Sequence, residues 1–371
     1  MIDRRNFVTL SIGAAALVAT GARSGKAMAA VDYSNTGAEV RNRAPADDGF
    51  FMPAEWTPHE RTLMQFLPPQ NWYPHQLASA REEWALVANS VAKFEPVTMA
   101  VRPADRAEAK RLLSSEIELV EMPMNDGWCR DSGPVILVNQ DGERAVAGFE
   151  FNGWGAKFPP YDDDALVKAH LADHFGLPLY PAPLVAEGGG IAVDGEGTCI
   201  TTEECLLHSN RNPGKSKDEV TEVLKGWLGV EQVIWLSRGL TPDPITDGHV
   251  DGIAAFVEPG VVLLHTLDDR SDPNYAITQD AKQRLESTTD ARGRYLEVVE
   301  LPLAYDIVHM NFYICNGGVV VPTAGDPRQD DEPLAVLREV FPQHKVVPVS
   351  GQMLSEGGGG VHCITQQMPA I

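Results

Sequence analysis

The sequence is poor in cysteine and lacks the spacings by which cysteine and histidine bind metals or form redox pairs. Its 371 residues include five cysteines, none in a CxxC pair, and ten histidines, none in an HExxH motif. These absences argue against a zinc knuckle, a thioredoxin-like dithiol and a zincin site. An odd number of cysteines leaves at least one thiol unpaired. We therefore expect one thiol to be kept for chemistry.

Basic residues are scarce relative to acidic ones. Thirty Lys and Arg against 52 Asp and Glu give a formal net charge of -22 at pH 7. A surface with this charge repels nucleic acid and anionic membranes, and it attracts cations. The composition therefore argues against a nucleic-acid partner and favours a small cationic substrate.

Long hydrophobic runs are absent beyond the N-terminus, so no later segment is expected to span a bilayer. At the N-terminus, Arg4 and Arg5 precede a short apolar run from Phe7 to Ala22, and "AMAA" follows at residues 27–30. This pattern predicts a twin-arginine secretory signal over residues 1–29, with cleavage after Ala29 and export to the periplasm or beyond. We expect an extended arm over residues 30–51 and a single catalytic domain over residues 52–371.

Short apolar segments alternate with segments of helical period in the rest of the chain, which predicts an α/β fold. Expected strands cover 60–67, 97–101, 133–139, 197–202, 260–266 and 317–323. Expected helices cover 75–94, 104–115, 215–228 and 332–341.

Five polar residues beside glycines recur at even intervals. They are Asp131, Glu187, His249, Asn311 and Cys363, separated by 56, 62, 62 and 52 residues. A repeat of roughly 60 residues predicts five modules arranged radially, as propeller blades are. The polar ends of their strands would then meet at one central site.

The stretch "GGVHCITQQ" places Cys363 after a glycine-rich turn, where backbone and substrate can approach closely. A lone cysteine with a histidine elsewhere is a candidate nucleophile pair. We expect His362 not to be that partner, because neighbours on a strand point to opposite faces. His249 and Asp251 are two residues apart in "ITDGHVDGIAAF", so on a strand they would share a face as an acid–base pair.

Further carboxylates lie beside glycines in "MNDGWCRDSGP" and "VAEGGGIAVDGEGT", among them Asp126, Asp131 and Glu187. Carboxylates can hold a flat cation through paired hydrogen bonds, and Trp128 can stack on it. A guanidinium is planar, cationic and rich in donors. A thiol, a histidine and several acids therefore favour an enzyme that attacks a guanidinium carbon.

The order of these motifs resembles the agmatine deiminase family, which is related to bacterial peptidylarginine deiminases. The resemblance runs from Met52 to Pro369 and includes "FMPAEWTPHERTLMQFLP", "MNDGWCRDSGP", "FNGWGAKF", "EGGGIAVDGEGTCITTEECLLHSNRNP", "TDGHVD", "NFYICNGGVVVPTAGD" and "EGGGGVHCITQQMP". It implies a five-bladed α/β propeller (pentein) that hydrolyses agmatine to N-carbamoylputrescine and ammonia, with no cofactor and no metal.

The resemblance also implies the roles of six residues. They are Cys363 as nucleophile, His249 as acid/base, Glu187 as the acid beside it, Asp131 and Asp251 as guanidinium ligands, and Trp128 as a wall of the substrate channel.

Two positions depart from the family pattern. Many members carry an acid four residues before the histidine of "GHVD", where this chain has Ile245. Many also carry a histidine shortly after the "EGG" motif, where this chain has Ala192. The physiological guanidine therefore stays open, with an exported arginine or peptidylarginine deiminase, or an amidinotransferase, as alternatives. A periplasmic protein that binds polyamines or guanidines is the alternative outside enzymes. The sequence does not decide whether the protein is a monomer or a homo-oligomer. It also leaves open whether Cys199 and Cys205 form a disulfide.

Overall fold

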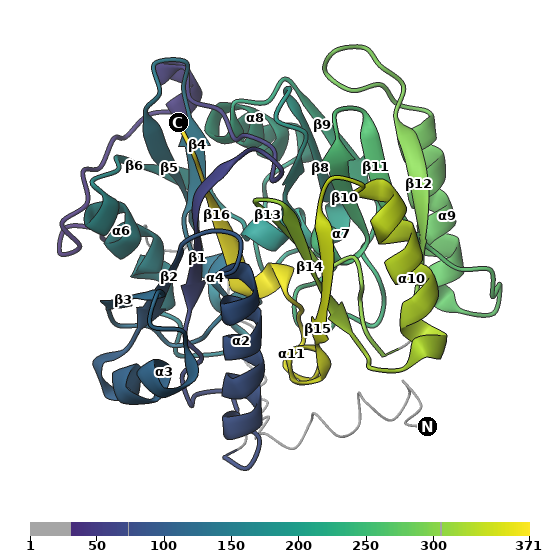
Figure 1. Cartoon of the computed structure of the whole chain (residues 1–371). Helices are drawn as coiled ribbons and strands as arrows, with labels where there is room; N and C mark the ends of the chain where they lie inside the picture. The colour runs from purple at the N-terminus through teal and green to yellow at the C-terminus, as the bar shows by residue number, and fades with distance from the viewer. Residues whose placement is uncertain (1–30, 73, 305) are drawn as a thin grey trace, which may run out of the picture.

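The protein is described by a computed structural model that covers residues 31–72, 74–304 and 306–371 (Figure 1). The predicted signal over residues 1–29 lies outside the described residues. Within the described ranges, no helix is both long and apolar enough to cross a bilayer.

The strands form five small sheets. The first contains β16 (Thr365–Pro369), β1 (His59–Gln65), β2 (Val97–Val101) and β3 (Glu118–Glu121). The other four contain β4 (Val135–Val138), β5 (Arg144–Glu150) and β6 (Leu179–Val185); β7 (Ala192–Val193), β8 (Thr198–Thr202) and β9 (Gln232–Leu236); β10 (Ala254–Glu258), β11 (Val261–Thr266) and β12 (Glu297–Pro302); and β13 (Tyr313–Cys315), β14 (Gly318–Thr323) and β15 (Lys345–Ser350).

The five sheets share one topology. In each, the first strand runs antiparallel to the second, and the second runs parallel to the third, as in β4, β5 and β6. In the sheet of β1, the antiparallel strand is β16 from the end of the chain, and β2 and β3 follow in parallel. Figure 1 shows yellow β16 beside dark β1, so the C-terminus completes the sheet that the N-terminal part began. The prediction of a five-fold α/β repeat is confirmed.

Helices connect and cover the sheets. They are α2 (Leu77–Val91), α3 (Arg106–Leu112), α4 (Cys129–Ser132), α5 (Gly153–Ala156), α6 (Asp164–Phe175), α7 (Glu203–Leu206), α8 (Lys217–Leu228), α9 (Pro273–Glu286), α10 (Pro327–Val340) and α11 (Gln352–Glu356). Short 3-10 turns occur at η2 (Pro45–Asp48), η3 (Pro103–Asp105), η4 (Gly188–Gly190), η5 (Val250–Gly252) and η6 (His362–Ile364).

Local chemistry fixes the clearest of these helices. Helix α8 begins at a capping box, in which Ser216 and Glu219 satisfy each other's backbone N–H groups, and it ends at Gly229 with a left-handed φ of 63°. Each expected strand and helix overlaps an observed one, whereas the helices α6 and α9 and the strands β3, β5, β6, β7, β9, β10, β12, β13, β15 and β16 were not predicted.

Buried strands and helices form the cores that hold the site in place. All five residues of β2 are buried, as expected of a strand that pairs in parallel on both sides. The largest core cluster joins Trp84 of α2 to Met64 of β1, Met99 of β2 and Val320 of β14. This cluster therefore links the first and last sheets around the C-terminal turn.

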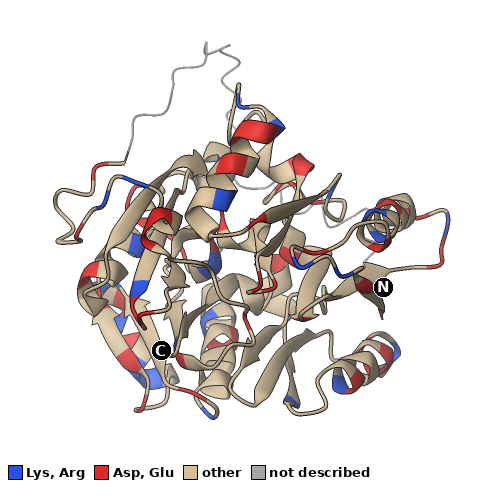
Figure 2. Ribbon diagram, turned by 90° about the horizontal axis from the view of Figure 1, so that it is seen from above, with Lys and Arg blue, Asp and Glu red and all other residues tan. Residues whose placement is uncertain are grey.

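The segment before β1 lies along the sheet of β4, β5 and β6. Val40 forms a β-bridge with Leu179, and Phe51 forms one with Val138. In Figure 2, acidic and basic residues both occur on the outer helices and loops, and neither kind is confined to one part of the fold.

Candidate active site

Each of the five evenly spaced polar residues lies in the turn just before the first strand of a sheet. Asp131 precedes β4, Glu187 precedes β7, His249 precedes β10, Asn311 precedes β13 and Cys363 precedes β16. Because the sheets repeat one topology, these five residues occupy equivalent positions. The contacts among them show that the five turns meet.

The thiol of Cys363 faces an amide and a carboxylate. Its backbone N–H donates to Asn311 Oδ1 at 3.2 Å, and Sγ donates to the same oxygen at 3.3 Å. Asp251 Oδ2 lies 3.6 Å from the sulfur. Burial, together with the negative charges of Asp251 and Asp131, raises the pKa of Cys363 well above its ordinary value. The thiol is therefore protonated in the free site at neutral pH.

Three predicted site residues converge on Gly189. A Cβ built at Gly189 would lie 2.5 Å from His249 Nδ1, 2.9 Å from Asp251 Oδ2 and 3.0 Å from Asp131 Oδ1. The backbone N–H of Gly189 donates to Asp131 Oδ1 at 3.0 Å. Glycine is therefore required here because any side chain would displace the groups that form the site.

The prediction that His249 and Asp251 share a strand is wrong. Asp251 lies in η5, His249 immediately precedes it, and β10 begins only at Ala254. Asp247 and Gly248 have φ angles of 60° and 87°, so the chain turns just before His249 and the extended conformation is broken. The two side chains approach each other through this turn and not through strand alternation.

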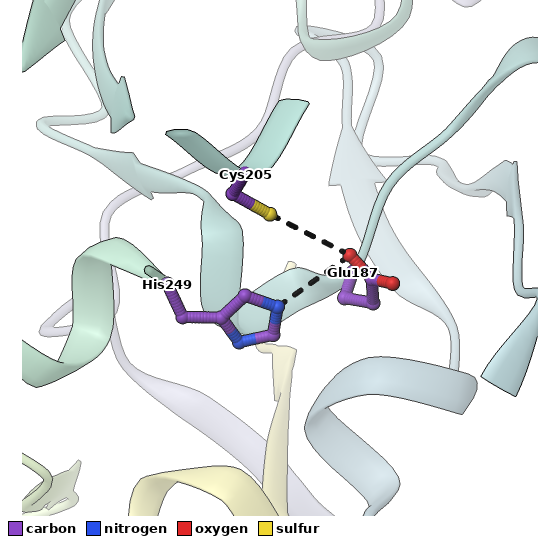
Figure 3. A group of neighbouring side chains, drawn as sticks. All are labelled: Glu187, Cys205 and His249. Carbon is purple, nitrogen blue, oxygen red and sulfur yellow. Dashed lines mark hydrogen bonds and ion pairs between the residues drawn. The ribbon is translucent and has the colours of Figure 1, made fainter. Parts of the chain in front are cut away.

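Figure 3 shows His249 beside Glu187 and Cys205. His249 Nε2 lies 3.5 Å from Glu187 Oε2, and Cys205 Sγ lies 3.9 Å from the same oxygen. His249 Nδ1 lies 3.9 Å from Asp131 Oδ1. Burial disfavours the charged imidazole, but Asp131, Cys205 and Glu187 outweigh it and raise the pKa of His249 well above its ordinary value. His249 is thus poised as a proton donor.

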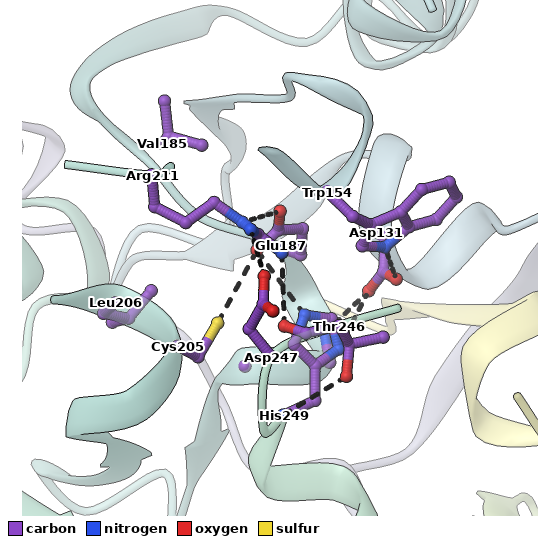
Figure 4. A network of polar contacts seen from close by, with 12 residues as sticks. Asp131, Trp154, Val185, Glu187, Cys205, Leu206, Arg211, Thr246, Asp247 and His249 are labelled. Atoms are coloured by element: carbon purple, nitrogen blue, oxygen red, sulfur yellow. Dashed lines mark hydrogen bonds and ion pairs between the residues drawn. The ribbon is translucent and has the colours of Figure 1, made fainter. Parts of the chain in front are cut away.

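A buried arginine holds Glu187 as an anion (Figure 4). Arg211 Nε lies 2.6 Å from Glu187 Oε1, and Arg211 Nη1 lies 2.9 Å from Asp247 Oδ2. Burial opposes ionisation of Glu187, but Arg211 and His249 outweigh it and lower its pKa. The donor atoms of Glu187, Cys205 and His249 lie within 4.8 Å of one another, a nitrogen, sulfur and oxygen set that zinc can use. Arg211 would compete with such a cation for Glu187.

Cys363 and Asp131 open into a cavity of about 460 Å³. Its other lining residues are Asn71, Trp72, Asp126, Trp128, Trp154, Phe158, Ile245, Thr246, Gly357 and Gly358. Trp154 Nε1 donates to Asp131 Oδ2 at 2.9 Å and so orients this carboxylate. An aromatic wall with a carboxylate and a thiol at its base suits a cation with an apolar stem.

The glycine run before Cys363 is packed against that wall. A Cβ at Gly359 would lie 2.4 Å from Trp128 Cζ3 and 3.1 Å from Cys363 Cβ. A Cβ at Gly358, whose φ is 92°, would lie 2.0 Å from Ile245 Cδ1. The glycines therefore allow Trp128 and Ile245 to pack against the backbone beside the thiol. The sequence analysis predicted that these glycines let the substrate approach, and it did not predict this packing role.

Sequence reasoning missed several groups around the site. Trp154, Arg211 and Glu55 fall within motifs that carry the family resemblance, but nothing in their local pattern indicates their contacts. His362 lies in the η6 turn and not on a strand, and its ring contacts Asp251, which in turn contacts the thiol. The expectation that His362 points away from Cys363 therefore missed its indirect link to the site.

Comparison with known proteins places the chain in a family. The family model described as Porphyromonas-type peptidyl-arginine deiminase matches residues 51–369. The chain is 42% identical over 360 residues to a protein of Ectopseudomonas mendocina named agmatine deiminase, covering 88% of this chain and 97% of that protein.

Two solved structures have the same fold. One, described as agmatine deiminase of Enterococcus faecalis catalysing its reaction, superposes with a TM-score of 0.86 at 35% identity, covering 90% of this chain and 99% of that chain. The other, C. jejuni C315S agmatine deiminase with substrate bound, has a TM-score of 0.78 at 26% identity and covers 86% and 96%.

Proposed function

The chain belongs to the Porphyromonas-type peptidyl-arginine deiminase family, and on this premise we propose that it hydrolyses agmatine to N-carbamoylputrescine and ammonia. The observation that carries the proposal is that Asp251 contacts the Cys363 thiol, and that Asp251, Asp131 and His249 converge on Gly189, beside the cavity that Cys363 and Asp131 line. The relatives from Ectopseudomonas mendocina, Enterococcus faecalis and C. jejuni are named agmatine deiminases, which supports agmatine as the substrate.

The reaction proceeds through a covalent intermediate on Cys363. The thiolate adds to the guanidinium carbon, His249 protonates the departing nitrogen, and ammonia leaves. The sulfur then carries a thiouronium. His249 next accepts a proton from water, and the resulting hydroxide adds to the same carbon. This adduct collapses with loss of its hydroxyl proton to solvent, which releases the neutral ureido product and restores the thiolate.

Substrate binding itself favours the thiolate. Asp131 and Asp251 are the proposed guanidinium ligands, and their charges are also among the causes that raise the pKa of Cys363. A bound guanidinium offsets both charges, so the pKa of the thiol falls when the electrophile arrives. Glu187 remains an anion beside His249 and stabilises its protonated form.

The part of the cavity that would contact the ammonium end of agmatine has Ile245 where many family members carry an acid. Ile245 lines the cavity and offers no charge to an ammonium group. Asp126 lines the same cavity, accepts a hydrogen bond from Asn71 Nδ2 at 2.9 Å, and has its pKa raised to about 6 by burial. We assign Asp126 as the partner of the agmatine ammonium. Arginine or a peptidyl-arginine is the second candidate substrate, which the apolar Ile245 favours.

We also propose that the mature enzyme works outside the cytoplasm, since residues 1–29 carry the pattern of a twin-arginine signal. Replacing Arg4 and Arg5 by lysine should retain the protein in the cytoplasm, as measured by cell fractionation. Equal export of the two forms would contradict this route.

Trapping the intermediate tests the chemistry. The enzyme is mixed with agmatine, quenched in acid within the first turnovers and digested for peptide mass spectrometry. We expect the peptide that contains Cys363 to gain the mass of agmatine minus ammonia, and Cys363→Ser to gain nothing. Turnover with an adduct on another cysteine would contradict the assignment.

A further inference from the structure

The reaction above leaves a second buried histidine unused. His362 Nδ1 lies 2.9 Å from Asp251 Oδ2, and His362 Nε2 lies 2.9 Å from Glu55 Oε2. An ionised carboxylate can only accept hydrogen bonds, so two such contacts require a proton on each ring nitrogen. His362 is therefore an imidazolium held between two anions.

The charged and titratable groups around His362 come from several elements. Glu55 precedes β1, Asp251 lies in η5, Arg130 lies in α4, and the Cys363 thiol follows in the chain. Arg130 Nη2 lies 3.2 Å from Glu55 Oε2, and Arg130 Nε donates to the His362 carbonyl at 3.3 Å. Burial and Arg130 disfavour the imidazolium, but Glu55 and Asp251 outweigh them and raise the pKa of His362. Burial opposes ionisation of Glu55, yet His362 and Arg130 lower its pKa to about 2.

His362 and the thiol face different spaces. His362, Asp251, Glu55 and Arg130 line a second cavity of about 530 Å³, and no residue that lines it also lines the cavity of Cys363. Within the described chain, His362 therefore reaches the reacting groups through Asp251. The same oxygen, Asp251 Oδ2, contacts both the imidazole and the sulfur, at 2.9 Å and 3.6 Å.

We propose that His362 is a positioning residue whose imidazolium fixes the Asp251 carboxylate at the site and offsets the negative charge that Asp251 places beside the Cys363 thiol. The effect on the thiol stands by itself, whereas the effect on turnover rests on the proposed function. Without the imidazolium, Asp251 can rotate away from its substrate-binding position, and its uncompensated charge makes the thiolate harder to form.

His362→Gln tests the proposal, because glutamine can donate one hydrogen bond but carries no charge. The first measurement is the pH dependence of Cys363 alkylation by iodoacetamide without substrate, with the modified peptide identified by mass spectrometry. We expect the alkylation midpoint to rise by about one pH unit, a roughly tenfold slower reaction at neutral pH. Because alkylation needs no turnover, this measurement tests the effect of His362 on the thiol even if agmatine is not the substrate.

The second measurement is steady-state kinetics, in which we expect KM to rise and kcat to fall in His362→Gln. His309→Gln is the matched control, since His309 is also buried and pairs with Asp330 at 2.8 Å. This control should lower the melting temperature but leave the alkylation profile unchanged. An alkylation midpoint in His362→Gln that equals the wild-type value would overturn the proposal.

Glu55→Gln tests the role of the His362 imidazolium if His362→Gln does not fold. It removes the outer anion, so the pKa of His362 falls and its imidazolium is lost as the pH rises. We expect Glu55→Gln to approach wild-type activity at acidic pH and to lose activity on the alkaline side earlier than wild type. A loss of equal size at every pH would mark Glu55 as merely structural and contradict the role of the imidazolium.

Discussion

Asp251→Asn should make the thiol more reactive and the enzyme less active. Asp251 Oδ2 lies 3.6 Å from Cys363 Sγ. At an effective dielectric constant of about 20, unit charges at about 4 Å interact by about 4 kcal/mol. That energy corresponds to roughly three units of thiol pKa. His362, 2.9 Å from the same oxygen, cancels part of the effect. We therefore expect the pKa of Cys363 to fall by about one to two units in this variant.

Turnover should change in the opposite direction, because the guanidinium loses one of its two carboxylates. Truncating one partner of a buried charge pair costs about 2–5 kcal/mol, so kcat/KM should fall at least about thirtyfold. The assay compares iodoacetamide alkylation against pH with steady-state ammonia release on the same preparation. A thiol pKa that stays constant or rises in Asp251→Asn would refute the electrostatic reasoning.

Three further variants probe other parts of the site. Gly189→Ala should reduce kcat/KM more than tenfold, because its Cβ would lie 2.5 Å from His249 Nδ1. The control Gly252→Ala should retain activity, because a Cβ at this position meets no atom within 4 Å. Equal activity of the two variants would contradict the convergence of site residues on Gly189. Arg211→Met should lower the free energy of unfolding by about 3–5 kcal/mol in urea titrations, because the variant leaves Glu187 charged and buried without its partner. A decrease below about 1 kcal/mol would contradict this role of Arg211. Asp126→Asn should raise KM for agmatine at pH 8 about tenfold or more while leaving KM for an uncharged-tail guanidine unchanged; an equal change for both would remove Asp126 from tail binding.

The sequence predicts the repeat well because each sheet begins just after a polar turn. The even spacing of Asp131, Glu187, His249, Asn311 and Cys363 reflects this arrangement directly. Helix α6 escapes prediction because burial covers most of its circumference, Asp164 and Lys168 included, so no apolar stripe appears. Helix α9 buries only a narrow row of apolar residues, which gives a weak periodic signal.

The site is less predictable than the fold because its supporting contacts join distant segments. Glu55 and His362 are 307 residues apart, and no local pattern indicates that they pair. Arg211 likewise meets Glu187 and Asp247 only after three turns have come together. The sequence does predict the chemical kinds of group that meet at the centre. The turn at Asp247 and Gly248, and not a strand, decides how His249 and Asp251 face each other.

Ammonia release by the mature chain tests the central claim most directly. Agmatine, arginine and a blocked peptidyl-arginine are offered separately to the wild type and to Cys363→Ser. We predict release of ammonia from agmatine by the wild type, with N-carbamoylputrescine as the second product, and no release by Cys363→Ser. Binding of agmatine without ammonia from any of the three would contradict it and indicate a binding protein. Release from arginine or the peptide alone would contradict the assigned substrate.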